Sequence, residues 1–320
     1  MMTPHPETVL AQSETSSVLR AGVLDRPRLA RFARAVKSFD ELDPAIGTAL
    51  AERIEAGESV RQVIAAPKQA VLPVRREKPS LLQAFLPWEL TPDWVLVLTQ
   101  DRVLVATIRA GSTPVVTATA IADILSFEMG KILLQAWVEW TYSIQNRADR
   151  IRIYFNTVSE LLFRRLLDCL RQSVMTSHPP ASDRHLEYLA DLPFKFMNII
   201  THELLLPGEQ VQAVVFQPAI WTTQFRFFHH QQAAARALVL TDCHILIAEE
   251  ELTGRTDHWG LITRFFPRSR IQSATLEREP TSACLQLILE HRGATQTARL
   301  AFEPGAEAAL DKMLARLQIQ

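Results

Sequence analysis

One short apolar pattern, which occurs twice, constrains this chain more than any other feature. Residues 94–106 read WVLVLTQDRVLVA, and residues 237–248 read ALVLTDCHILIA. In each segment two apolar runs flank a short polar turn, which is typical of a β-hairpin. The threonines that begin the two turns, Thr99 and Thr241, are 241 − 99 = 142 residues apart. This repetition predicts two copies of one antiparallel fold.

Three further segments repeat at a similar spacing. Residues 57–67 (GESVRQVIAAP) match residues 208–218 (GEQVQAVVFQP), at 208 − 57 = 151. Residues 124–126 (ILS) match residues 271–273 (IQS), at 271 − 124 = 147. The same offset aligns two apolar stripes at helical spacing, which predict a helix at the end of each copy. They are Phe163, Leu166, Leu167 and Leu170 in the first copy and Leu310, Met313, Leu314 and Leu317 in the second.

The repeat divides the chain into five expected parts. At 320 residues the chain is long enough for two domains with cores of their own. We expect a disordered tail over 1–20, an N-terminal helical segment over 21–48, a first domain over 49–172, a linker over 173–189 and a second domain over 190–320. Short helices are expected over 25–38 and 44–55. How the two copies pack against each other stays open.

The order of elements in each copy resembles the bacterial pleckstrin-homology-like (PH-like, GRAM-like) fold. The resemblance rests on a G-E-x-V motif before the first strand and a V-L-T-x-x-R motif at the next hairpin. The matching residues are Gly57, Glu58, Val60, Val97, Leu98, Thr99, Arg102 and Val103, then Gly208, Glu209, Val211, Val239, Leu240, Thr241 and Ile245, with His244 in place of the arginine. It covers residues 49–172 and 190–320. It implies an α+β chain of two domains, each a strongly bent antiparallel sheet of about seven strands capped by a C-terminal helix.

Composition excludes some classes of function. The net charge is −1 and the pI is about 6.8, which disfavours a nucleic-acid binder, because such proteins need a basic surface to neutralise phosphates. The first residues lack the pattern of a signal peptide, and no apolar run reaches the roughly 20 residues that cross a bilayer. Three widely spaced cysteines suit a reducing compartment as buried thiols. We therefore expect a cytoplasmic protein.

Two basic clusters predict a site for an anionic lipid. PH-like domains often hold phosphoinositide head groups with basic residues of the first hairpin, and the loop after the first strand of the first copy loosely resembles that arrangement. Its candidates are Lys68, Arg75, Arg76 and Lys78, joined by Arg28, Arg31 and Arg34 on the basic face of the expected 25–38 helix. Clustered cations hydrogen-bond phosphate oxygens, which supports this interpretation. The alternative is that both clusters are ordinary solvated surfaces.

The aromatic residues of 216–228 predict a different kind of site. Trp221, Phe225 and Phe227 lie in the equivalent loop of the second copy. Packing in the core is one interpretation. The other is a docking surface for a protein, since PH-like sheets have open edges that accept a partner strand.

The sequence lacks nucleophile-elbow, zinc-site and glycine-rich phosphate-loop motifs. We expect no enzymatic activity, no cofactor and no metal. The leading hypothesis is a non-enzymatic adaptor that binds an unknown protein partner or itself. The alternative is a peripheral membrane binder, and the test between them is whether the two basic clusters lie on one face. A weaker third hypothesis is a small-molecule pocket between the two domains.

Overall fold

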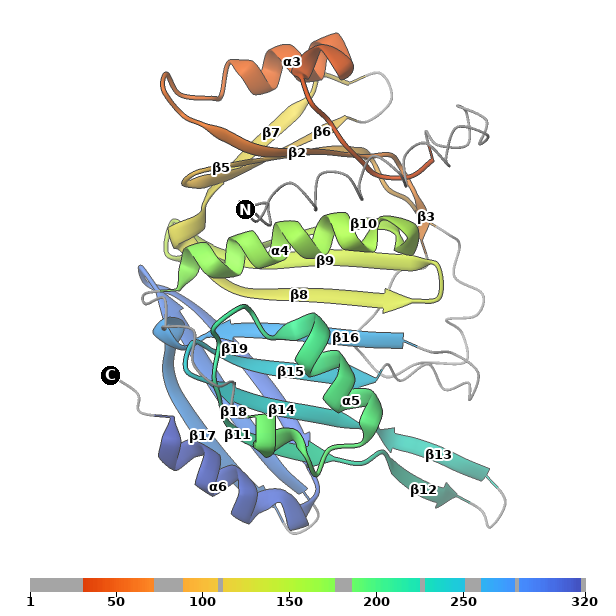
Figure 1. Ribbon diagram of the computed structural model, residues 1–320, viewed down its shortest axis with the longest axis vertical. Helices are drawn as coiled ribbons and strands as arrows, with labels where there is room; N and C mark the ends of the chain where they lie inside the picture. The colour runs from red at the N-terminus through yellow and green to blue at the C-terminus, as the bar shows by residue number, and fades with distance from the viewer. Residues whose placement is uncertain are drawn as a thin grey trace, which may run out of the picture.

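The computed structural model describes residues 31–71, 89–108, 112–175, 186–224, 228–250, 260–279 and 282–317. Within these ranges the chain is an α+β protein of mainly antiparallel strands, in sheets of five, seven and three strands with two short two-stranded ribbons (Figure 1). No helix in the described ranges is both long enough and apolar enough to cross a membrane.

The first copy of the repeat forms four strands, then three strands, then a helix. The four belong to the five-stranded sheet, whose order is β1-β2-β5-β6-β7. Its strands are β1 (Arg34–Ala35), β2 (Val60–Ala66), β5 (Asp93–Thr99), β6 (Arg102–Ile108) and β7 (Val115–Ala120). The next elements are β8 (Ile124–Ile132), β9 (Gln135–Ile144), β10 (Arg147–Asn156) and the helix α4 (Glu160–Val174).

The second copy repeats this order of elements. Its four strands are β11 (Val211–Gln217), β14 (Arg236–Thr241), β15 (His244–Glu250) and β16 (Gly260–Pro267). They are followed by β17 (Ile271–Glu279), β18 (Ser282–His291), β19 (Ala294–Phe302) and the helix α6 (Glu307–Arg316). After the first strand, each copy adds a small ribbon on the same side of the molecule: β3 (Ala70–Val71) with β4 (Glu89–Leu90), and β12 (Ile220–Gln224) with β13 (Phe228–Ala233) (Figure 1).

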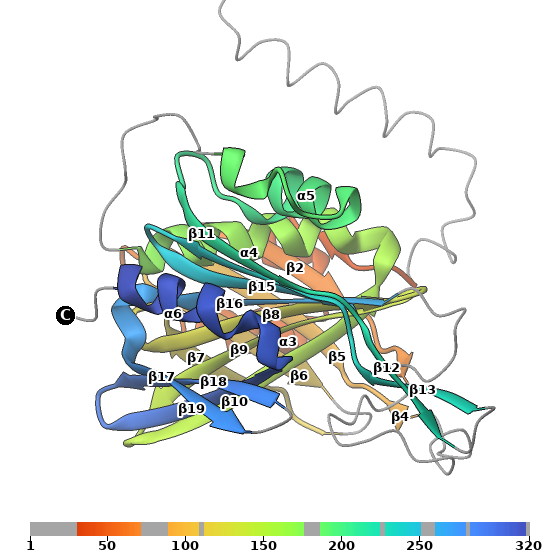
Figure 2. The ribbon, with the colours of Figure 1, turned by 90° about the horizontal axis from the view of Figure 1, so that it is seen from below.

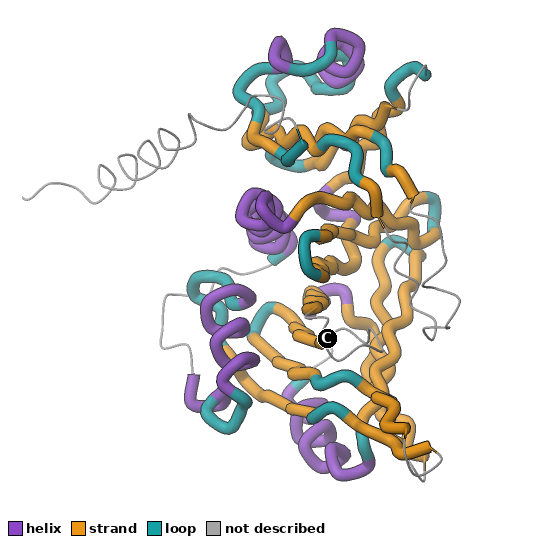
Figure 3. Tube along the Cα trace, turned by 90° about the vertical axis from the view of Figure 1, so that its right-hand side faces the viewer, coloured by secondary structure: helices purple, strands orange, loops and turns teal. Residues whose placement is uncertain are grey.

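The two copies are joined by direct strand pairing. The three last strands of the first copy and the four first strands of the second form one sheet, in the order β10-β9-β8-β16-β15-β14-β11. At the joint β8 pairs antiparallel with β16, from Phe127 opposite Phe265 to Ile132 opposite Gly260. In Figure 3 the strands follow one another along the long axis of the molecule, with helices on the flank. The copies therefore form one body.

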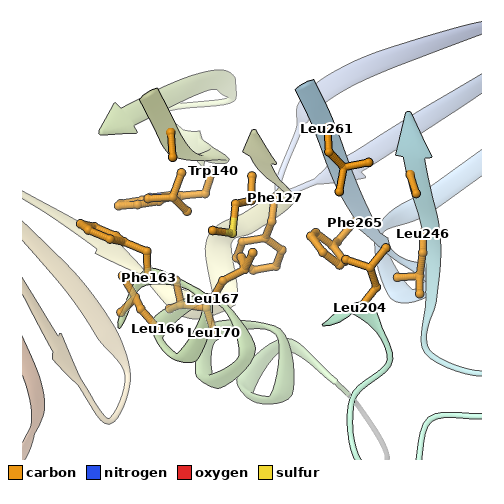
Figure 4. Close-up of a cluster of buried hydrophobic side chains, with 14 of the residues drawn as sticks. Phe127, Trp140, Phe163, Leu166, Leu167, Leu170, Leu204, Leu246, Leu261 and Phe265 are labelled. Carbon is orange, nitrogen blue, oxygen red and sulfur yellow. The ribbon is translucent and has the colours of Figure 1, made fainter. Parts of the chain in front are cut away.

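A shared hydrophobic cluster fills the joint. It combines Phe127 and Leu167 of the first copy with Leu204, Leu261 and Phe265 of the second, all buried. Figure 4 shows these side chains meeting between α4 and the seven-stranded sheet. Because this cluster spans both copies, separating them would expose a large apolar surface to water.

The repeated hairpin is apolar throughout because both of its faces are covered. In β14, Ala237 and Val239 point into the shared cluster, whereas Leu238 and Leu240 point into the inner core of the second copy, which α6 closes. Strands buried on both faces read as continuous apolar runs rather than as alternating ones. Figure 2 shows the two coverings: α4 and α5 (Phe194–Ile199) on one face of the seven-stranded sheet, and β17–β19 on the other.

The N-terminal segment departs from expectation. The helix expected over 25–38 is wrong in its described part, because Arg34–Ala35 forms β1, with Arg34 opposite Ala65 of β2. The open edge of β2 offers hydrogen bonds, such as the 2.9 Å bond from the Val36 N–H to the Val63 carbonyl, that a marginal isolated helix does not match.

The second short helix is confirmed but ends early. The expected span 44–55 is α3 (Pro44–Ala51), which the Asp43 side chain caps and which packs Leu50 on the outer face of the five-stranded sheet. The expected boundary between residues 48 and 49 falls inside this helix.

Candidate functional site

The two motifs shared by the copies meet in space as a clasp. In the first copy Glu58, just before β2, binds Arg102, which begins β6. The Arg102 Nε lies 3.0 Å from Glu58 Oε1, and a second bond joins the Nη2 to Oε2. The hydrogen bond from Arg102 lowers the pKa of Glu58 to about 2. The clasp fixes the start of β2 against the hairpin turn, which is a structural role.

The second copy builds the same clasp in a fully buried form. The Thr241 hydroxyl donates to Glu209 Oε1 at 2.6 Å, and His244 Nδ1 lies 2.9 Å from the same oxygen. The positive charge comes from Arg171 of α4, whose Nη2 lies 3.2 Å from Glu209 Oε2. Burial opposes ionisation, but the Arg171 charge and the hydrogen bonds from His244 and Thr241 outweigh it and lower the pKa of Glu209 to about 2.

His244 is neutral in this setting. Burial lowers its pKa below the usual range. Its Nδ1 faces the Glu209 carboxylate, while its buried Nε2 has no hydrogen-bond partner among the described residues. A proton on Nε2 would place a second positive charge close to Arg171 in the interior, where burial disfavours it.

A row of six paired charges crosses the joint between the copies. Three arginines and three glutamates lie one on each of six neighbouring strands, β10, β9 and β8 of the first copy and β16, β15 and β14 of the second. The contacts are Arg152–Glu139 (2.6 Å), Arg152–Glu128 (3.2 Å), Arg264–Glu128 (3.0 Å), Arg264–Glu249 (2.8 Å) and Arg236–Glu249 (3.2 Å). The row is neutral as a whole, and it fixes the register in which β8 and β16 pair.

A polar cavity of about 190 Å³ lies beside this row, where β19 approaches the seven-stranded sheet. Its walls include Glu128, Glu139 and Arg264, and a 2.8 Å hydrogen bond from Ser126 to Gln296 closes part of it. The carboxylates of Glu128 and Glu139 are bound by arginines, so these walls offer little net charge to a ligand.

An exposed apolar tip stands at one end of the seven-stranded sheet. Leu133 and Leu134 form the turn between β8 and β9, Val158 lies in the short 3-10 turn before α4, and Leu161 lies in the first turn of α4; all four are between 59% and 69% exposed. The Thr157 N–H donates to the Leu134 carbonyl at 3.0 Å, which holds the two pieces together. We call these four residues the apolar tip.

The backbone of Leu133 is strained. Its φ is +52°, in the left-handed region that glycine and asparagine occupy readily and leucine rarely does. A bulky apolar residue in such a conformation, with its side chain in solvent, lowers the stability of the fold. Strain of this kind is typical of residues kept for function.

Basic residues border the apolar tip. The Ser159 hydroxyl at the start of α4 donates to the carbonyl of Ala33 at 3.0 Å, which places the segment of Arg31 and Arg34 beside the tip. The Gln69 side chain in turn donates to the Arg31 carbonyl at 3.2 Å, which places Lys68 next to the segment of Arg31. Arg31, Arg34 and Lys68 are exposed, and Arg34 is paired with Glu41 at 2.9 Å.

The structure thus brings together three of the seven basic residues predicted from sequence. Arg28, Arg75, Arg76 and Lys78 lie outside the described residues, as do Phe225 and Phe227 of the predicted protein-docking site. For Trp221 only the backbone, in β12, is described. Sequence reasoning missed the apolar tip, although two leucines at a strand turn, where polar residues are usual, were a readable signal.

Nothing in the described ranges assembles a metal site, because no group of three or more His, Cys, Asp and Glu side chains is suitably placed there. The three cysteines, expected to be buried, are only partly so. Burial raises the pKa of the Cys243 thiol to about 12, which leaves it protonated and unreactive at neutral pH.

No model of a known protein family matches this chain, and no curated protein matches it.

Proposed function

We propose that the chain is a non-enzymatic binding protein of two fused PH-like domains that docks on an anionic membrane surface through the apolar tip and the basic residues beside it. The PH-like assignment is supported by the order of four strands, three strands and a helix, which occurs twice. The observation that carries the function is the contact network linking Leu134, Ser159, Ala33 and Gln69.

The chemistry of this edge suits a bilayer interface. Moving an aliphatic side chain out of water is favourable, by roughly 1.5–3 kcal/mol for a leucine that becomes fully buried. Arginine and lysine add about 1 kcal/mol each near an anionic leaflet. Neither contribution alone gives stable binding, whereas a small apolar anchor and a basic patch act together.

The same side of the molecule carries both ribbons. β3 and β4 extend in the direction of the turn between β8 and β9 (Figure 1). Binding through this edge would therefore orient the long axis of the molecule along the membrane. The protein-docking role of Trp221, Phe225 and Phe227 stays a prediction.

Co-sedimentation with vesicles tests this function. We expect the protein to pellet with vesicles that contain phosphatidylserine, and to pellet much less with pure phosphatidylcholine or at high salt, which screens the basic residues. Replacing Arg31 and Lys68 with glutamate should weaken binding by at least about fivefold each. Arg147→Glu and Arg150→Glu, exposed at the opposite end of β10, are the matched controls. Binding that is equal on neutral and anionic vesicles would refute the proposal.

A further inference from the structure

In the described part of the chain, the joint leaves one equivalent strand at each end of the molecule at the edge of its sheet. β7 occupies in the first copy the position of β16 in the second: Ala120 pairs with Arg102 as Pro267 pairs with His244, at 267 − 120 = 147. β17 occupies the position of β8, at the same offset of 271 − 124 = 147. Among the described residues, β7 is the edge of the five-stranded sheet and β17 the edge of the three-stranded sheet.

The burial of these four strands follows their pairing. β8 and β16, which pair with each other, are mostly buried, whereas β7 and β17 are mostly half-buried or exposed. The sequence of β7 is VVTATA, with high strand propensity and with no charge or proline. Natural proteins usually protect a sheet edge with charged residues or proline. An edge that lacks them, such as β7, is a template for another strand.

We propose that β17 of one molecule pairs with β7 of a second copy of this chain and so repeats, between molecules, the joint that β8 and β16 make within one. The register follows from the offset. Adding 147 to a β8 residue gives its equivalent in β17, and subtracting 147 from a β16 residue gives its equivalent in β7. The pair Phe127–Phe265 therefore corresponds to Ala274–Ala118, and the pair Glu128–Arg264 corresponds to Thr275–Thr117. Leu276 then faces Val116.

The predicted pairs are compatible. Thr–Thr and aliphatic pairs stabilise antiparallel strands by roughly 0.2–1 kcal/mol each, and no like charges face each other in this register. Val116 and Leu276 are each partly buried against their own cores, so the new strand would extend existing apolar faces. α6 packs on β17 beside this edge, and its Arg278–Glu307 ion pair (3.3 Å) occupies the position of Lys131–Glu160 (3.0 Å) in the first copy.

The contact between molecules is weaker than the joint within the chain. Two facing phenylalanines are replaced by two alanines, and the ion pair by two threonines, so much less apolar surface is buried. The association is therefore reversible and depends on concentration. It is also head-to-tail, because each molecule uses a different strand at each end, and such contacts build rings or open chains. This assembly goes beyond membrane binding and does not depend on it.

Sedimentation velocity on the full chain, with lysine substitutions at the two edges, tests the proposal. Ala118→Lys blocks β7 and Thr275→Lys blocks β17; both positions are exposed, so the fold should be kept. Ala148→Lys, at an exposed position of β10, is the matched control. We expect the wild type and the control to form larger species as concentration rises, and each edge variant alone to stay monomeric.

Mixing the two edge variants decides the symmetry. An equimolar mixture has one intact β7 and one intact β17 on different molecules, so it should form dimers and nothing larger. The proposal is overturned if the wild type stays monomeric, if either variant associates like the wild type, or if the mixture stays monomeric. Circular dichroism and thermal unfolding of each variant would show that the fold is intact.

Discussion

The guanidinium of Arg171 on α4 lies 3.2 Å from the carboxylate of Glu209, and neither side chain is exposed to solvent. The same arginine donates to the Leu204 carbonyl at 2.8 Å. α4 ends the first copy and Glu209 begins the second, so a buried ion pair links them. The first copy completes its clasp with its own Arg102, whereas the second takes its charge from the neighbouring copy.

Glu209→Gln should therefore destabilise the protein strongly. It leaves the buried Arg171 paired only with the partly exposed Asp168, at 3.4 Å, and breaking a buried ion pair typically costs 3–5 kcal/mol in the free energy of unfolding. Glu58→Gln is the matched control and should cost only about 1–2 kcal/mol, since Arg102 can be solvated. Urea denaturation measures both. Equal losses in the free energy of unfolding would mean that burial of the second clasp does not increase its contribution to stability.

Acid should destabilise the fold in two stages. The folded pKa of His244 lies below the unfolded value of about 6.5, so the unfolded state takes up its proton first and the contribution of His244 is lost as pH falls below that value. Glu209, with a pKa of about 2, contributes fully above the unfolded value of about 4.3 and loses that contribution as pH falls toward 2.

His244→Gln isolates the first stage because glutamine does not titrate. The free energy of unfolding of this variant should decline less than that of the wild type between about pH 7 and about pH 5. The comparison needs denaturant curves at several pH values in that range. Parallel pH profiles for the two proteins would contradict a depressed pKa at His244.

Leu133→Asn should raise stability while it weakens membrane binding. Asparagine tolerates a positive φ, so relief of the strained turn should add about 1 kcal/mol to the free energy of unfolding. The loss of an exposed apolar side chain should reduce vesicle binding. Leu134→Asn is the control, which should reduce binding without raising the melting temperature. A melting temperature of Leu133→Asn at or below that of the wild type would argue against strain.

The two copies should unfold together. Phe265→Ala opens a cavity in the shared cluster and should cost about 3–5 kcal/mol. Differential scanning calorimetry should show one transition, shifted down as a whole, because the cluster belongs to both copies. Two resolved transitions, of which only one moves, would show that the copies are independent domains.

The sequence predicts the repeated part of the fold well for a physical reason. Strands such as β5 and β14 are covered on both faces, so burial alone dictates the apolar runs around Thr99 and Thr241. α4 and α6 are likewise visible as stripes, because each buries one face only.

Other features depend on partners far away in the chain. β1 forms because the edge of β2 is open, which the local pattern around Arg34 does not reveal. The joint between β8 and β16 depends on how two copies meet, and a single copy carries no sign of it. The basic residues Arg31, Arg34 and Lys68 could be named from the sequence. Their position relative to Leu134 follows only from the contacts of Ser159 and Gln69.

Vesicle binding by Leu134→Asp and Ile144→Asp tests the central claim most directly. Both residues are exposed and aliphatic, and they lie near opposite ends of β9, at the apolar tip and away from it. The membrane account predicts that Leu134→Asp lowers the affinity for phosphatidylserine vesicles by at least about tenfold, since it removes an apolar anchor and adds a negative charge. Ile144→Asp should bind like the wild type. Equal binding by the two variants would contradict the account.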